Sequence, residues 1–270
     1  MSVHSLADTN AAFSIAGRTA VITGGGRGAG AAIARMLAAS GASVLVAART
    51  ESEVARVAAE LCAAGATASA ATCDVSDPRS VQDLAALARK TYGRVDILIN
   101  NAGVAMAAPL ARTTLEDWNR MLAVNATGAF LCLQAFLPDM LQAKWGRVVN
   151  IASTAGLAAD RYIAAYAASK HALVGLTRAA AAEVGGHGVT VNAVCPGFLA
   201  TDMTDQSLKR VMVATGRSAD EALATITHRN PQKRLIDPEE VAAAVVYLCS
   251  DAARGINGTS LLIDGGELRR

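Results

Sequence analysis

Short runs rich in β-branched residues alternate with longer alanine-rich stretches along most of the chain. The short runs predict strands at residues 19–23, 43–48, 67–73, 95–100, 147–151, 190–194 and 260–263. The longer stretches predict helices at residues 28–40, 51–64, 77–93, 115–142, 162–184 and 237–248. Repeated β-α alternation is typical of an α/β fold, with a doubly wound parallel sheet and helices on both faces.

No linker interrupts this alternation, so the sequence predicts a single domain over residues 13–270. Residues 1–12 are expected to form an N-terminal leader without fixed structure. The alternation pauses between residues 196 and 231, and a stretch of that length without strand pattern favours a binding loop. We therefore expect a substrate lid at about residues 198–230.

Composition narrows the class of protein. The 270 residues are 52% hydrophobic but only 4% aromatic, and the formal net charge of +2 gives no electrostatic case for nucleic acid or an anionic membrane. The N-terminus lacks the layout of a secretory signal, and no uninterrupted apolar run reaches the roughly 18–20 residues of a membrane span. Five scattered cysteines are odd in number and lack metal-ligand spacing, which indicates reduced thiols in the cytoplasm and no metal.

A glycine-rich turn joins the first predicted strand to the first predicted helix. Gly24, Arg27, Gly28, Ala29 and Gly30 lie in this turn. Glycines let a pyrophosphate approach the backbone, and the helix N-terminus offers N–H groups to the anion. Such a turn also serves as a plain strand-to-helix connection, but its place in the first β-α unit favours dinucleotide binding.

The end of the second strand bears on which dinucleotide binds. NAD binders usually carry an acidic residue there, whereas this strand ends at Arg49. Arg49 and Arg27 are suited to pair with a 2′-phosphate, so we expect NADP(H), with NAD(H) as the alternative. Glu51 and Glu53 follow close by, on the next predicted helix, and the two arginines also have a reading as solvated surface residues.

Tyr166 and Lys170 share one face of a predicted helix, because they are four residues apart. A neighbouring ammonium is expected to lower the pKa of the phenol, whose ordinary value is near 10. Ser153, upstream, offers a hydroxyl that can hold a substrate oxygen as it receives a proton. These groups suit reduction of a ketone or oxidation of a secondary alcohol, although the spacing alone arises often by chance.

Together, these motifs resemble the short-chain dehydrogenase/reductase family over about residues 14–266. The resemblance is carried by Thr23-Gly24, Gly28, Gly30, Asn100-Asn101-Ala102-Gly103, Asn125, Ser153, Tyr166, Lys170 and Pro196-Gly197. It is similar in particular to 3-oxoacyl-(acyl carrier protein) reductases and polyketide ketoreductases, through residues 151–156, 191–198, Thr201-Asp202-Met203 and Asp264-Gly265-Gly266. The resemblance implies a single-domain Rossmann-like fold.

The resemblance also implies residue roles. Tyr166 would be the general acid, Ser153 would hold the substrate oxygen, and Lys170 would lower the pKa of Tyr166 and hold the nicotinamide ribose. Asn125 would anchor a water that links Lys170 to solvent. The remaining implied contacts are to the cofactor, from Asp74 and Val75 near the adenine, Asn101 near the adenosine ribose, and Leu199 and Thr201 near the nicotinamide amide. Pro196 and Gly197 are also expected to bind the cofactor.

We therefore expect an NADPH-dependent reductase of a 3-oxoacyl thioester or a similar β-keto or polyketide substrate. The alternatives are an NAD(P)-dependent secondary-alcohol or hydroxyacyl-CoA dehydrogenase acting oxidatively, and a non-catalytic NADP-sensing protein. Lys209 and Arg210 in the lid are candidates for contact with a carrier or CoA phosphate, or are simply solvated. The resemblance further implies a homotetramer built through the helices at 115–142 and 162–184.

Overall fold

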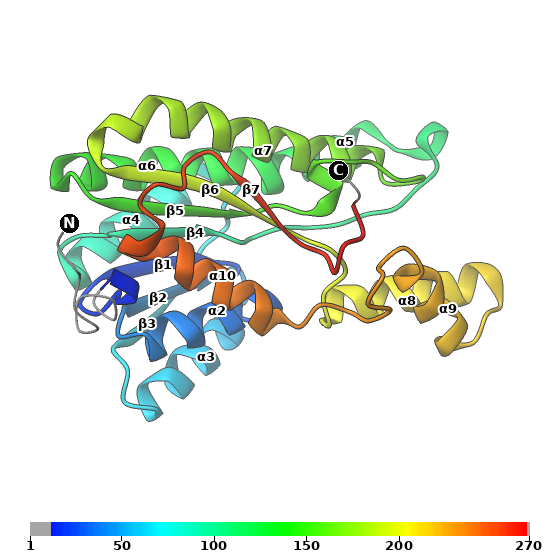
Figure 1. The fold of residues 1–270 in the computed structure, drawn as a ribbon, viewed down its shortest axis with the longest axis horizontal. Helices are drawn as coiled ribbons and strands as arrows, with labels where there is room; N and C mark the ends of the chain where they lie inside the picture. The colour runs from blue at the N-terminus through cyan, green and yellow to red at the C-terminus, as the bar shows by residue number, and fades with distance from the viewer. Residues whose placement is uncertain (1–11, 269–270) are drawn as a thin grey trace, which may run out of the picture.

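The computed structural model describes residues 12–268, so the predicted leader at residues 1–12 lies almost wholly outside the described residues. Seven parallel strands form one sheet in the order β3-β2-β1-β4-β5-β6-β7 (Figure 1). The strands are β1 (Thr19–Thr23), β2 (Ser43–Ala48), β3 (Ala68–Thr72), β4 (Ile97–Asn100), β5 (Gly146–Ile151), β6 (Val189–Pro196) and β7 (Ser260–Ile263).

Helices cover both faces of the sheet, which confirms the predicted doubly wound architecture (Figure 1). One face carries α2 (Gly28–Ala39), α3 (Glu51–Ala63) and α10 (Pro238–Cys249). The other carries α4 (Pro78–Tyr92), α6 (Gly128–Ala143) and α7 (Ala164–Val184). The helix α5 (Leu115–Leu122) leads into α6 and packs against α7, whereas α8 (Asp202–Thr215) and α9 (Ala219–Thr227) stand apart from the sheet.

Strands buried on both faces explain the near-continuous apolar runs in the sequence. In β1, all five residues are buried, with Ile22 packing in the core of one face and Val21 in the core of the other. Parallel sheets covered on both sides have this pattern because successive side chains point to opposite faces. The alanines of α2 and α10 let these two helices pack closely over the sheet.

The strand order reverses between β1 and β4, and in such sheets the crevice at this point is the usual ligand site. Thr23, at the end of β1, fastens the two loops that border it. Its hydroxyl accepts hydrogen bonds from the backbone N–H groups of Asn101 (3.1 Å) and Ala102 (3.1 Å). The Asn101 side chain in turn donates to the carbonyl oxygens of Thr23 (3.0 Å) and Gly24 (2.9 Å).

Two predicted helices and the predicted lid differ from the structure. The helix expected from residue 162 begins at Ala164, because Tyr162 has a left-handed φ of 70°. The helix expected over residues 115–142 is interrupted by a π-helical turn, η2 (Ala123–Thr127), and α6 then continues to Ala143. The segment expected as a lid without strand pattern is largely helical, since it forms α8 and α9.

The continuous helical segment Leu115–Ala143 is long and apolar enough to cross a membrane by length and composition. Within this protein its α6 portion packs on the sheet, with Cys132, Phe136 and Met140 fully buried. Asp139 on the same helix forms an ion pair with Arg89 of α4 at 2.9 Å. The core therefore accounts for the apolar residues on the buried face of α6, whereas Leu115, Trp118 and Phe130 of the same segment are exposed.

A cluster of charged and aromatic side chains lies at the edge of the sheet where the strands begin. The guanidinium of Arg147 is buried and stacks on one side of Trp145, and the Arg18 guanidinium also lies over that ring. Asp251 accepts hydrogen bonds from Arg147 Nη2 (2.8 Å) and Trp145 Nε1 (3.0 Å). This cluster lies at the opposite edge of the sheet from the glycine-rich turn, which follows the carboxyl end of β1.

Candidate active site

The glycine-rich turn packs so closely that side chains are excluded from it. A Cβ on Gly30 would lie 2.2 Å from the carbonyl oxygen of Gly24 and 2.4 Å from Asn101 Nδ2. Gly24 itself has a left-handed φ of 65°, and a Cβ there would meet the Cα of Ala102 at 2.8 Å. This bare backbone at the N-terminus of α2 fits the close approach of a pyrophosphate.

The N-terminus of α2 has no side-chain cap, since Arg27 at the N-cap position makes no capping hydrogen bond. Arg27 instead lies 3.9 Å from Glu53 on α3, and both side chains are partly exposed. Gly28 has a left-handed φ of 50°, and a Cβ there would meet the Thr201 side chain at 3.3 Å. The structure thus brings Thr201 to the glycine-rich turn, and contact of either segment with a cofactor stays a prediction.

Arg49 is exposed immediately after β2, and Glu51 and Glu53 lie on α3 beyond it. The Arg49 charge contributes to lowering the pKa of Asp74, although the hydrogen bond from the Ser76 side chain is the larger cause. Arg49 and Asp74 thus follow the neighbouring strands β2 and β3 at their carboxyl ends, close enough for their charges to interact. A cationic and an acidic group side by side suit the phosphate and adenine ends of one nucleotide.

The predicted catalytic residues come together from two elements at the carboxyl edge of the sheet. Tyr166 and Lys170 lie on α7, and Ser153 follows β5 at the start of η3 (Thr154–Gly156). The Ser153 side chain hydrogen-bonds the Tyr166 side chain. Lys170 Nζ donates to the Ile151 carbonyl oxygen at 2.8 Å and lies 5.9 Å from the centre of the Tyr166 ring.

The pKa of Tyr166 is raised, so the expectation that Lys170 would lower it is wrong for this arrangement. Burial is the largest cause, because removal from water disfavours the phenolate, and the Ser153 hydrogen bond opposes it. Burial also lowers the pKa of Lys170 to about 8. The buried Cys195 thiol is a further, smaller influence on both groups.

Asn125 is held by the π-helical turn, which directs its amide toward the loop after β4. Its Oδ1 accepts from the Val104 N–H at 2.8 Å, and its Nδ2 donates to the Val104 carbonyl oxygen (2.9 Å) and to Ser169 Oγ (2.9 Å). A Cβ on Gly103 would lie 3.3 Å from Asn125 Oδ1 and 3.6 Å from Lys170 Nζ. Asn125 and Lys170 therefore border the same small space, as the proton relay would require.

The remaining predicted cofactor contacts occupy three segments. Val75 packs against α6, where a Cβ on Gly128 would meet its side chain at 2.7 Å. Pro196 ends β6, and Gly197 continues into the lid, where its N–H donates to Ile263. Leu199 forms an isolated bridge with Ile236 at the base of the lid. Their orientation toward a cofactor stays a prediction.

Two polar residues near this site were missed from the sequence. Ser169 is fully buried and donates to the Tyr166 carbonyl oxygen at 2.7 Å, so it links Asn125 to the helix that carries the acid. A polar residue three positions after Tyr166, on the same helical face, was the available signal. Glu267 lies against Gly197, with Oε2 at 3.3 Å from a Cβ built there, and its distance along the chain gave no signal.

Among residues 12–268, no group of three or more His, Cys, Asp or Glu side chains is arranged to hold a metal ion. Within the same residues, none of the five cysteines forms a disulfide. Phenol, serine hydroxyl, amide and ammonium are thus the groups that the site offers for chemistry.

Comparison with known proteins agrees with this geometry. The profile of the short chain dehydrogenase family matches residues 18–211. D-threitol dehydrogenase of Mycolicibacterium smegmatis is 40% identical over 255 residues, which cover 94% of this chain and 94% of that protein. The 3-oxoacyl-[acyl-carrier-protein] reductase of Synechocystis is 39% identical over 251 residues, with 92% and 96% covered.

A solved structure of an actinorhodin polyketide ketoreductase variant with NADPH superposes with a TM-score of 0.90. It is 38% identical and covers 93% of this chain and 97% of its own. All three proteins match this chain over more than 90% of its length, but their names specify different substrates.

Proposed function

Because the chain belongs to the short-chain dehydrogenase family of oxidoreductases, we propose that it reduces a ketone to a secondary alcohol with NADPH. The substrate we propose is a 3-oxoacyl thioester or a related β-keto or polyketide compound. The observation that carries this proposal is the Ser153–Tyr166 hydrogen bond beside the buried Lys170 ammonium, at the same sheet edge as the glycine-rich turn. Similarity to ketoreductases supports the substrate class.

In this mechanism, Tyr166 donates its phenolic proton to the carbonyl oxygen, and Ser153 hydrogen-bonds that oxygen as negative charge develops on it. The Tyr166 phenol, whose ordinary pKa is near 10, is protonated at neutral pH and can donate this proton. Burial raises its pKa further, which makes it a weaker acid than an exposed phenol. Asn125 and Lys170 border a common space through which the proton is replaced. NADPH, when bound, supplies the hydride.

The cofactor would be held by the residues already placed around the crevice. Gly24, Gly28 and Gly30 provide bare backbone for the pyrophosphate. Arg49 would pair with the 2′-phosphate, because a guanidinium matches phosphate geometry. The structure of the similar actinorhodin polyketide ketoreductase variant contains NADPH, which supports this preference. We further propose a cytoplasmic homotetramer in which α5, α6 and α7 carry the contacts.

A panel of keto substrates followed at the nicotinamide absorbance, with NADPH and with NADH, tests this function. Tyr166→Phe should lower kcat by about 10²- to 10⁴-fold, the usual contribution of a general acid. Tyr162→Phe is the matched control, because that side chain is 56% exposed and is not in the proposed proton path. Retention of most of the rate in Tyr166→Phe would refute the mechanism.

Arg49→Ala tests the cofactor assignment separately. We expect the preference for NADPH over NADH, as a ratio of kcat/KM values, to fall by roughly tenfold or more, in line with loss of a charge-assisted phosphate contact. An unchanged ratio would leave the NADP(H) assignment without support from this residue.

Oxidation of a secondary alcohol is the second candidate, and similarity to D-threitol dehydrogenase favours it. The same panel separates the two when it includes polyols with NADP⁺ and NAD⁺. A non-catalytic NADP-sensing role predicts tight cofactor binding with no turnover on either arm. The assembled Ser153, Tyr166 and Lys170 argue for turnover.

A further inference from the structure

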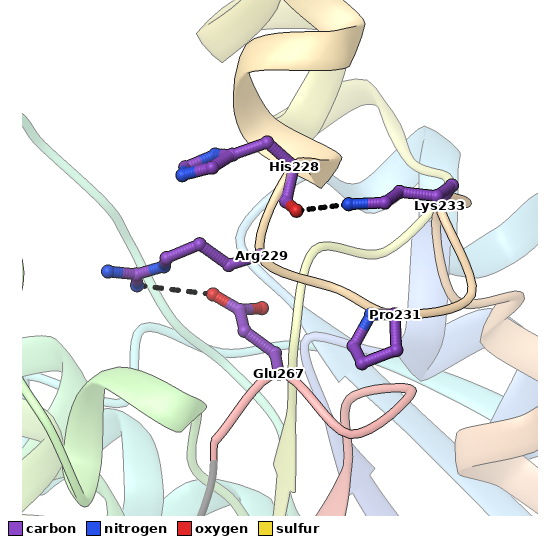
Figure 2. A pocket seen from close by; sticks show the side chains of 5 residues that line it. All are labelled: His228, Arg229, Pro231, Lys233 and Glu267. Atoms are coloured by element: carbon purple, nitrogen blue, oxygen red, sulfur yellow. Dashed lines mark hydrogen bonds and ion pairs between the residues drawn. The ribbon is translucent and has the colours of Figure 1, made fainter.

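A cavity of about 380 Å³ lies at the base of the lid, lined by His228, Arg229, Pro231, Lys233 and Glu267 (Figure 2). His228 and Arg229 follow α9, and Glu267 comes from the segment after β7. Three of these five side chains are of basic types, and one, Glu267, is acidic.

The charges around this cavity are unequally compensated. Arg229 Nη2 lies 3.2 Å from Glu267 Oε1 and 3.1 Å from Asp160 Oδ2, so two carboxylates neutralise it. Lys233 Nζ donates to the His228 carbonyl oxygen (Figure 2). Within residues 12–268 Lys233 has no carboxylate partner. Its positive charge is therefore available to a ligand in the cavity.

Lys233 is also held in place by its backbone. Its φ of 54° is left-handed, which is uncommon for a residue with a side chain, and its N–H donates to the Asn230 carbonyl oxygen at 2.9 Å. Asn230 is itself buried against the turn at Gly265. Such constrained backbone concentrates at ligand sites. The backbone thus fixes the point from which the exposed Lys233 side chain reaches the cavity.

The cavity adjoins the segments that carry the chemistry. The Glu267 side chain is only 6% exposed, and its Oε2 packs at Gly197, directly after β6. Asp160 lies in the loop that leads from η3 toward Tyr166. A substrate bound at Tyr166 whose other end carries an anion would have Lys233 and Arg229 within the same group of loops.

We propose that this cavity binds the phosphate of a 4′-phosphopantetheine arm. The inference rests on the proposed reduction of a 3-oxoacyl thioester, and it identifies the carrier end of that substrate. Lysine binds phosphate as a point charge, and arginine binds it through bidentate hydrogen bonds, which Arg229 can offer by exchanging Asp160 for the ligand. Coenzyme A and an acyl carrier protein share this phosphate.

In this proposal Lys209 and Arg210 do not contact the phosphate. Both are exposed on α8, and neither lines the cavity. Their charges are consistent with the solvated alternative considered from the sequence. Lys233, which the sequence pattern did not single out, takes their place.

Binding is tested without turnover by titrating 4′-phosphopantetheine and pantetheine into the full-length protein with saturating NADP⁺. The two probes differ by the phosphate alone. We expect 4′-phosphopantetheine to bind more tightly than pantetheine, and Lys233→Gln to weaken it by about threefold to tenfold, the range of a partly exposed charge-assisted contact. Lys209→Gln tests the rival position, and Lys90→Gln is an exposed control on α4.

Equal binding of both probes, or an equal effect of Lys233→Gln on each, would overturn the proposal. A loss confined to Lys209→Gln would return the contact to α8. If acetoacetate binding depends on Lys233 and 4′-phosphopantetheine does not displace acetoacetate, the cavity binds a substrate carboxylate instead.

Turnover separates failure of this inference from failure of the proposed function. Acetoacetyl-CoA is compared with acetoacetyl-N-acetylcysteamine, which lacks the phosphate, and the ratio of their KM values is measured. The ratio should rise about threefold to tenfold in Lys233→Gln and stay constant in Lys90→Gln. If neither thioester is reduced, the proposed function fails while the binding titration still decides the phosphate site. If both are reduced with an unchanged ratio, only the phosphate site fails.

Discussion

Gly30 offers a sharp test of the cofactor cradle, because steric and helical effects of one substitution oppose each other there. Alanine is intrinsically better than glycine inside a helix by about 1 kcal/mol, so propensity alone predicts that Gly30→Ala stabilises α2. The structure predicts the reverse. A Cβ would stand 2.2 Å from the Gly24 carbonyl oxygen and 2.4 Å from Asn101 Nδ2.

The magnitude follows from these contacts. Relief requires a shift of roughly 1 Å in the turn or in Asn101, and overpacking of this kind costs about 1–3 kcal/mol. The same shift displaces Asn101 Nδ2 from its hydrogen bonds to Thr23 (3.0 Å) and Gly24 (2.9 Å), at about 1 kcal/mol each. After the helical gain is subtracted, we expect a net loss of about 2–4 kcal/mol.

Thermal unfolding and NADPH titration measure the two consequences. At about 2–4 °C per kcal/mol for a domain of this size, Tm should fall by roughly 4–16 °C. NADPH binding should weaken at least about tenfold, since the turn no longer presents its backbone in the same place. Wild-type Tm together with wild-type NADPH affinity in Gly30→Ala would refute the reasoning.

Gly175→Ala is the matched control for Gly30→Ala. Gly175 also lies inside a helix, α7, but a Cβ there would meet nothing within 4 Å. Propensity is then unopposed, and we expect stability to rise by about 0.5–1 kcal/mol with unchanged NADPH affinity. Size-exclusion chromatography accompanies this control, because α7 is a proposed contact between protomers.

Two further predictions concern buried charge. Burial lowers the pKa of Lys170 from 10.5 to about 8, so between these values the unfolded state binds more protons and stability rises with pH. The free energy of urea unfolding should therefore increase by about 2 kcal/mol more in wild type than in Lys170→Met from pH 8 to pH 10, and parallel curves would contradict this. At the opposite edge of the sheet, Asp251→Ala leaves the buried Arg147 guanidinium without its carboxylate and should lower stability by about 2 kcal/mol, or roughly 4–8 °C in Tm. Asp83→Ala, an exposed change on α4, should leave Tm within about 1 °C of wild type, and an equal drop in both variants would count against the Arg147 argument.

Most of the architecture was predictable because strands that are buried on both faces, such as β1, have continuous apolar runs in the sequence. Helix starts were less so, since the left-handed backbone at Tyr162 has no residue signature in the sequence. Spacing and family resemblance were enough to single out Ser153, Tyr166 and Lys170, which the structure brings together; their catalytic roles stay a prediction. The sign of the pKa shift at Tyr166 was not, because it depends on how deeply the surrounding chain buries the phenol, while sequence spacing reports only that an ammonium is near.

The cavity that contains Lys233 was also beyond the sequence. Its walls come from the end of α9 and from the segment after β7, which are far apart along the chain. Lys233 has a left-handed backbone, and a single residue of this kind belongs to no helical or strand pattern that would single it out in the sequence. The Lys233 charge faces a cavity only because the two segments come together in the fold.

The π-helical turn Ala123–Thr127 has a consequence for how this protein can vary in length. A π turn holds one residue more than an α turn, so deleting a single residue here would restore regular winding without shortening any loop. The wider turn absorbs this extra residue, so α5 and α6 would keep roughly their present alignment while the residues inside the turn change their directions. The Asn125 amide would turn away from Val104 and Ser169. Chain length within these five residues is therefore constrained by geometry, whereas the lid beyond β6 remains open to insertion.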